Sequence, residues 1–172
     1  FWFSGDIGRR DLPLLRDPVL PKDVDYLLME STYGDKVHRD PQVAFDELKK
    51  ITARTVARGG KIIIPAFAVG RTQELVYCFH QMLDNGDVPR IPVFVDSPWA
   101  INASEIFRAH PEVFDEETRA FMRSNRHHAA LDFDGLKYTR SVWESKAIND
   151  VKGPAVIISA SGMAEVGRIL HH

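Results

Sequence analysis

Residues 59–83 read GGKIIIPAFAVGRTQELVYCFHQML and contain one complete strand–helix unit. The two glycines at its start end a preceding helix, and residues 61–64 are expected to form a short, buried strand. Apolar residues then recur at helical spacing from about Thr72 to Leu83, which predicts a helix directly after the strand. An apolar strand without polar alternation is typical of a parallel sheet that is covered on both faces.

The same strand–helix order recurs on both sides of this unit. Further apolar runs predict strands at residues 1–3, 26–29, 91–95, 136–141 and 154–158. Helical spacing predicts helices at residues 41–58, 98–109, 115–124, 143–150 and 163–172. Pro92 places its strand at an edge of the sheet or marks the start of that strand. The alternation predicts an α/β fold, in which a parallel, Rossmann-like sheet is flanked by helices.

The composition indicates an ordinary globular domain. The chain has 172 residues, with 22 basic and 24 acidic side chains, so its formal charge is −2 and no general basic coating attracts nucleic acid. Any phosphate-binding surface must therefore be local. Cys78 is the single cysteine, which excludes an intramolecular disulfide and a cysteine zinc cluster. No apolar run approaches the roughly 20 residues that cross a membrane, so we expect no membrane partner and a cytoplasmic protein.

Two carboxylates follow expected strands at equivalent points. Asp6 follows the strand at residues 1–3, and Glu30 follows the strand at residues 26–29; we expect these strands to be neighbours. Paired acids at the carboxyl edge of a sheet can bind metal or act in acid–base catalysis, and helix capping is the alternative. The motif Asp96-Ser97-Pro98 follows another strand, and there we expect a helix N-cap.

Three other positions suggest anion binding. Arg71 lies at a helix N-terminus, where its charge opposes the helix dipole; a bound anion would offset this, and a salt bridge to Glu74 is the alternative. Gly162 would allow a tight turn with open amides. Gly167 beside Arg168 is explained either by close approach of a phosphate or by tight helix packing.

The histidines do not form a recognisable metal motif. His127-His128 and His171-His172 are adjacent pairs, whose side chains diverge on a helix or a strand. No H-x-H or H-E-x-x-H spacing is present. If Asp6 binds metal, most of the other ligands are expected outside this chain.

Six blocks of the sequence follow one another in a fixed order. The blocks are FSGDIGRRDLPLLRDP (3–18), DYLLMESTYGD (25–35), GGKIIIPAFAVGRTQELVY (59–77), VDSPWA (95–100), ESKAIN (144–149) and ISASGMAEVGRILHH (158–172). Together they resemble the β-CASP metallo-β-lactamase nucleases, and the resemblance covers essentially the whole chain. This family of RNA-processing enzymes includes ribonuclease J and the polyadenylation-specificity endonuclease, and the bacterial and archaeal RNA-processing exonuclease branch is the most similar.

The resemblance implies roles for individual residues. Asp6 matches the aspartate that bridges two zinc ions, which makes it both a catalytic and a metal-binding residue. Glu30 matches the acid of the first β-CASP motif, which pairs with a downstream histidine that protonates the leaving group. The residues expected to contact the RNA backbone are Arg71, Ser161, Gly162, Met163 and Arg168. Two Zn²⁺ ions per complete site and single-stranded RNA are the implied cofactor and partner.

The resemblance also implies boundaries. Residues 1–32 match part of the metallo-β-lactamase core, residues 33–163 the β-CASP domain, and residues 164–172 its end and the return towards the core. The H-x-H-x-D-H motif and the later histidine motifs of the family are absent, so we expect an interior fragment that is inactive alone. A partial core would expose residues 1–3 and 169–170, so we expect self-association, as a homo-oligomer, unless other chains cover them.

The predicted function is therefore that of a fragment of a zinc-dependent RNA-processing nuclease. Phosphodiester hydrolysis would be endonucleolytic, 5′–3′ exonucleolytic or both. Two alternatives stay open: a non-catalytic RNA-binding or scaffold paralogue, and a nucleotide-binding α/β domain without kinship to nucleases. The intact Asp6 and Glu30 favour the enzyme over the first alternative, and the lack of a dinucleotide fingerprint disfavours the second.

Overall fold

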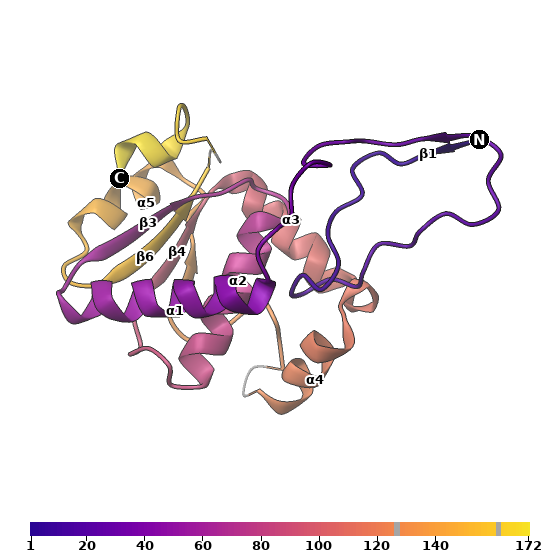
Figure 1. The fold of residues 1–172 in the computed structure, drawn as a ribbon. Helices are drawn as coiled ribbons and strands as arrows, with labels where there is room; N and C mark the ends of the chain where they lie inside the picture. The colour runs from indigo at the N-terminus through magenta and orange to yellow at the C-terminus, as the bar shows by residue number, and fades with distance from the viewer. Residues whose placement is uncertain (126–127, 161–162) are drawn as a thin grey trace.

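A four-stranded parallel sheet forms the centre of the molecule (Figure 1). The computed structural model describes residues 1–125, 128–160 and 163–172. The strand order is β3-β6-β4-β5, and every neighbouring pair is parallel. The bounds are Lys61–Pro65 for β3, Val93–Asp96 for β4, Leu136–Tyr138 for β5 and Ala155–Ser159 for β6. The predicted α/β fold with a parallel sheet is confirmed.

The register places β4 and β6 in the middle of the sheet. Val93 of β4 is aligned with Val156 of β6 and with Leu136 of β5. Pro92 therefore does not mark an edge strand. It directly precedes β4, where its carbonyl accepts a hydrogen bond from the Val156 amide (3.0 Å), so it marks the start of the strand.

Helices cover both faces of this sheet. On one face, Val95 and Ile158 belong to the main apolar core, with side chains from α1 (Pro41–Ala57), α2 (Arg71–Asp84) and α3 (Pro98–Ala109). On the other face, Phe94 and Ile157 pack with Ile148, in a smaller cluster beneath α5 (Val142–Ala147) and the 3₁₀ helix η2 (Ile148–Asp150). Burial from both sides explains why these strands are apolar throughout. The remaining elements are η1 (Pro111–Val113) and α4 (Glu116–Ser124).

Local signals set the helix starts. Asp40 caps α1 by accepting hydrogen bonds from the amides of Gln42 (2.7 Å) and Val43 (3.3 Å). Ser97 caps α3 by accepting from the Ala100 amide (3.2 Å), and a proline occupies the first turn of both helices. The predicted N-cap at residues 96–98 is therefore made by Ser97.

Residues 1–40 form a separate, extended region (Figure 1). Its strands β1 (Trp2–Phe3) and β2 (Leu27–Leu28) pair in parallel, as expected for neighbours. Unlike the central sheet, this pair is exposed, with Phe1 at 87% and Phe3 at 69% of full exposure. The buried Leu14 attaches the region to the rest of the molecule.

Two expectations about the last residues were wrong. The predicted helix over 163–172 is reduced to one 3₁₀ turn, η3 (Arg168–His171), because Gly167 has a φ of +88° and Ala164 a φ of +55°, both outside the right-handed helical region. Ile169, expected to be exposed, is buried, whereas Leu170 is exposed. None of the helices in the described part of the chain is long and apolar enough to span a bilayer.

Candidate functional site at the carboxyl edge of the sheet

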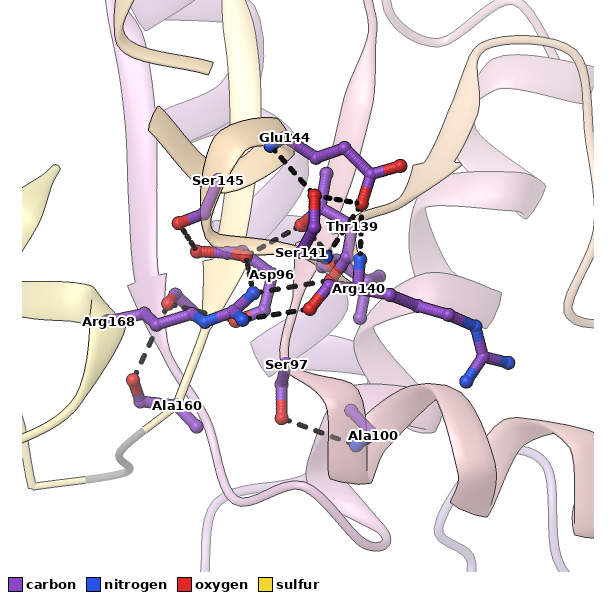
Figure 2. A network of polar contacts seen from close by, with 12 residues as sticks. Asp96, Ser97, Ala100, Thr139, Arg140, Ser141, Glu144, Ser145, Ala160 and Arg168 are labelled. Atoms are coloured by element: carbon purple, nitrogen blue, oxygen red, sulfur yellow. Dashed lines mark hydrogen bonds and ion pairs between the residues drawn. The ribbon is translucent and has the colours of Figure 1, made fainter. Parts of the chain in front are cut away.

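Asp96 lies at the carboxyl end of β4, the edge at which parallel sheets bind ligands (Figure 2). All four residues of β4 are buried, and Asp96 itself has no exposed surface. A charge in such a position is stable only when it is paired and hydrogen-bonded. The surroundings of this carboxylate therefore decide what the edge does.

Four side chains donate to the Asp96 carboxylate. Oδ1 accepts from the Thr139 hydroxyl (2.6 Å) and from Nη1 of Arg168 (2.7 Å). Oδ2 accepts from the Ser145 hydroxyl (2.7 Å) and lies 2.9 Å from Nε2 of His172. Two of these partners, the guanidinium and the imidazole, can carry positive charge, so Asp96 is the anion of a buried ionic cluster.

The pKa of Asp96 reflects two opposed causes. Burial raises the pKa, because it disfavours the charged carboxylate. Hydrogen bonds from Ser145, Thr139, His172 and Arg168 lower it and prevail, so the pKa lies below its ordinary value of 3.8. Asp96 is consequently an anion at neutral pH and cannot act as a general acid there.

Arg168 uses its guanidinium to join two segments. Besides the ion pair with Asp96, Nη2 donates to the Arg140 carbonyl (2.9 Å) and Nη1 lies 3.4 Å from the Thr139 carbonyl. Only 23% of the side chain is exposed. The predicted contact of Arg168 with RNA stays a prediction, and the observed contacts are internal. By contrast, Figure 2 shows the Arg140 guanidinium pointing away from the cluster, where it pairs with Glu105 on α3.

The segment between β6 and Arg168 carries the other predicted RNA contacts. Met163 is exposed beside the edge, at 69% of full exposure. Ser161 and Gly162, also predicted to bind substrate, lie outside the described residues, as does His127.

The loop after β3 brings Arg71 to the same edge. Gln73 holds this loop, since its Oε1 accepts from the Gly70 amide (2.8 Å) and its Nε2 donates to the Ala68 carbonyl (3.1 Å). Arg71 Nη1 lies 2.6 Å from Glu74 Oε2, so the salt bridge left open from the sequence is formed. Burial raises the pKa of Glu74, and the charge of Arg71 opposes that rise. The Arg71 side chain remains 57% exposed and accessible to an anion.

Asp6 and Glu30 lie together in the N-terminal region. Glu30 Oε1 accepts a hydrogen bond from the Ile7 amide (2.6 Å), and the Glu30 amide donates to the Ser4 hydroxyl (2.9 Å). Glu30 thereby fixes the turn that presents Asp6. Within the described ranges the Asp6 carboxylate has no hydrogen bond or ion pair, and its residue is exposed. Asp6 is thus accessible to a ligand from outside this chain.

The described residues of this chain do not form a complete metal centre. Across residues 1–125, 128–160 and 163–172 no group of three or more His, Cys, Asp or Glu side chains could hold an ion. Asp6 supplies one accessible carboxylate, and Glu30 is engaged with a backbone amide. A two-zinc site therefore does not fit this chain by itself.

The sequence did not reveal the Asp96 cluster. The sequence pattern presents Asp96 as part of a capping motif and His172 only as one of an adjacent histidine pair, and it does not single out Thr139 or Ser145. One signal was available: an aspartate that ends an apolar strand in the middle of a two-sided sheet needs compensating donors. Its partners could not be identified because they lie 43 to 76 residues further along the chain.

The fold and this edge define an α/β domain of the kind that binds ligands beyond the carboxyl ends of its strands. Within that class, a family model described as "Beta-Casp domain" matches residues 72–172. The match covers more than half of the chain, and the chain belongs to the Beta-Casp domain family. The membership expected from the six sequence blocks is confirmed.

Curated relatives are similar to this chain over most of its length. Ribonuclease TTHA0252 of Thermus thermophilus is 37% identical over 171 residues, which is 99% of this chain and 38% of that protein. Transcription termination factor FttA of Methanothermobacter thermautotrophicus is 34% identical over 87% of this chain and 23% of its own. Endoribonuclease YSH1 of Eremothecium gossypii is 27% identical over 96% of this chain and 21% of its own. The chain thus spans less than two-fifths of each relative.

Proposed function

We propose that this chain is the β-CASP part of a metal-dependent RNA-processing nuclease. The observation that carries the proposal is the 37% identity, over 99% of this chain, to a protein named ribonuclease. Relatives named endoribonuclease and transcription termination factor support the same class of substrate. In this proposal RNA binds as a single strand, and the protein is cytoplasmic and self-associates through the exposed β1–β2 region.

The residues of this chain would bind and orient the substrate. Arg71 offers an exposed guanidinium to the RNA backbone, and the segment from Met163 onwards lies at the same edge. Such contacts fix the position of the strand without reading its sequence. Asp6 is presented by the turn that Glu30 holds, and this accessible carboxylate is the residue offered to the reaction centre.

For the complete enzyme we propose zinc as the catalytic metal. Metal dependence is general among β-CASP nucleases. The described residues of this chain supply one accessible carboxylate, Asp6, towards such a metal site. Removal of metal with a chelator should abolish cleavage by the complete enzyme, and Zn²⁺ should restore it more fully than Mg²⁺.

The test replaces Asp6 by Asn in the nuclease that contains this chain. We expect cleavage of a labelled single-stranded RNA to fall by at least about a thousandfold, whereas RNA affinity changes by less than about threefold, because the substituted carboxylate acts in the reaction. Asp23→Asn is the matched control, as an exposed aspartate of the same region, and should cleave like the wild type. An Asp6→Asn variant with wild-type cleavage would contradict the catalytic assignment.

A non-catalytic RNA-binding function is the second candidate. The exposed Arg71 guanidinium is the observation that supports it, because this side chain would bind an RNA backbone whether or not the strand is cut. RNA binding by the wild-type protein without cleavage at any metal concentration would establish this function in place of the nuclease.

A further inference from the structure

One buried carboxylate ties the last residues of the chain to the sheet. Arg168 and His172 contact different oxygens of Asp96, at 2.7 and 2.9 Å. The cluster unites three sequence blocks: residues 95–100 supply the anion, and residues 144–149 and 158–172 supply donors. Blocks that are far apart in the sequence therefore contribute to one ionic cluster.

The contacts of His172 hold its ring from both sides. Nε2 faces the Asp96 carboxylate, and Nδ1 lies 2.8 Å from Oδ1 of Asn149. The amide of Asn149 is oriented by its other end, because Nδ2 donates to the His171 carbonyl (2.8 Å). Both ring nitrogens thus face oxygen atoms, and the position of the imidazole is fixed between Asp96 and Asn149.

The tied segment follows β6 at the carboxyl edge of the sheet. The Ile169 amide donates to the Ala160 carbonyl (3.0 Å), and the Ile169 side chain is buried. Residues 163–167 are not helical, and both Met163 and Val166 are exposed. The contacts of Arg168 and His172 therefore attach the carboxyl-terminal end of residues 163–167 to the sheet.

We propose that Asp96 is a positioning residue, whose ion pairs with Arg168 and His172 hold residues 163–167 in the conformation that contacts a single-stranded RNA backbone. The inference rests on the proposed function, and it assigns Arg168 to the anchor of this segment. Asp96 has no exposed surface and does not touch the RNA; it acts through the segment that it holds.

Charged and polar groups from each packed element contribute to the anchor. Lys61 of β3 lies behind it, with Nζ 3.3 Å from the Asn149 carbonyl and 3.4 Å from the Ile148 carbonyl. The groups in direct contact with Arg168 and His172 are Asp96, Asn149 and the carbonyls of Thr139 and Arg140. Glu144 of α5 interacts with Arg168 through its charge, without a hydrogen bond to it. Among the described residues Asp96 is the carboxylate that contacts both Arg168 and His172, so its substitution removes the charge that they share.

The test compares Asp96→Asn with Thr139→Val in the nuclease that contains this chain. Asp96→Asn removes the anion, whereas Thr139→Val removes one neutral donor to the same oxygen and leaves both ion pairs. Hydrogen exchange at the Ile169 amide reports whether the segment is held. Michaelis constants on a short single-stranded RNA report whether the segment positions substrate.

We expect Asp96→Asn to accelerate Ile169 exchange and to raise KM about tenfold, with kcat changed by less than about threefold, because contacts to the bound strand are lost. Thr139→Val should lower stability but leave exchange and KM near the wild-type values. If KM rises in both variants in proportion to lost stability, the role of Asp96 is structural only and the proposal fails.

Two further outcomes separate this proposal from the proposed function. Faster Ile169 exchange in Asp96→Asn with an unchanged KM would refute the RNA role and leave the nuclease intact. A wild-type protein that neither binds nor cleaves RNA would refute the nuclease and the RNA role together, while the exchange data would still decide whether Asp96 is the anchor.

Discussion

Two aspartates lie at the carboxyl ends of parallel strands in this molecule, and their surroundings are opposite. Asp96 is the last residue of β4 in the central sheet, is wholly buried and accepts hydrogen bonds from four side chains. Asp6 follows β1 in the N-terminal region, is exposed and has no such partner among the described residues. A carboxylate whose acceptors are all used stabilises the fold, whereas one with open acceptors is available to an external ligand. Position relative to the strand alone does not distinguish the two.

The largest expected effect is on stability and separates the two aspartates. Asp96→Asn should lower the free energy of unfolding by about 3 kcal/mol, because it leaves Arg168 and His172 buried without their anion. Asp6→Asn should change it by less than about 0.5 kcal/mol, as is usual for exposed positions. Urea unfolding at pH 7, followed by circular dichroism, measures both.

These two variants also test the contrast itself. If Asp6→Asn destabilises the protein as much as Asp96→Asn does, Asp6 has a structural role and the division between the regions is wrong. If both are neutral, the Asp96 cluster contributes nothing net to the stability of the fold.

The next largest expected effect on stability concerns Arg168, which belongs to the cluster, and Arg140, which points away from it. Arg168→Met should destabilise by about 2 kcal/mol, since the guanidinium serves Asp96 and two carbonyls while largely buried. Arg140→Met is the matched control: its ion pair with Glu105 is exposed on both sides and should contribute less than about 1 kcal/mol. Equal losses would show that burial does not determine the value of these ion pairs.

A smaller expected effect is the change with pH in the stability difference between the wild type and Asp96→Asn. The folded-state pKa of Asp96 lies below 3.8, so its stabilising contribution is present above pH 3.8 and is lost as the pH falls through the lowered pKa. The stability difference between the wild type and Asp96→Asn should therefore be constant between pH 7 and pH 5 and shrink as the pH is lowered below 3.8. A difference independent of pH would mean that the charge of Asp96 is not the stabilising feature.

Most of the central sheet could be predicted because its signals are local. The strands at residues 61–64 and 154–158 were placed within one residue of β3 and β6, since continuous apolar runs are bounded by glycine or proline. The terminal helix was predicted wrongly because periodicity does not register the positive φ of Gly167. The exposure of residues 1–3 was expected once a partial core was inferred, whereas that of β2 was not.

In the candidate site too, the features with a local sequence signal were predicted and those without one were missed. The sequence placed Asp6 and Glu30 after two neighbouring strands, and the parallel pairing of these strands, β1 and β2, is confirmed. It left the Arg71–Glu74 salt bridge as an alternative, because residues three apart on a helix are neighbours. The Asp96 cluster was missed because its donors come from the residue after β5, from α5 and from residues 168–172, and only the folded sheet brings them together.

The smallest effect tests how Asp6 is presented. Glu30→Ala removes the acceptor of the Ile7 amide, so the turn at residues 4–7 should loosen and exchange at the Ile7 amide should rise by about tenfold, equivalent to about 1.4 kcal/mol of local opening. Global unfolding should change by less than about 0.5 kcal/mol, because the N-terminal region contributes little to the main core. Glu30→Gln, which keeps an amide oxygen, should restore most of the protection. If exchange at Ile7 is already fast in the wild type, Glu30 does not hold this turn in solution, and Asp6 acquires its position only when an external ligand binds.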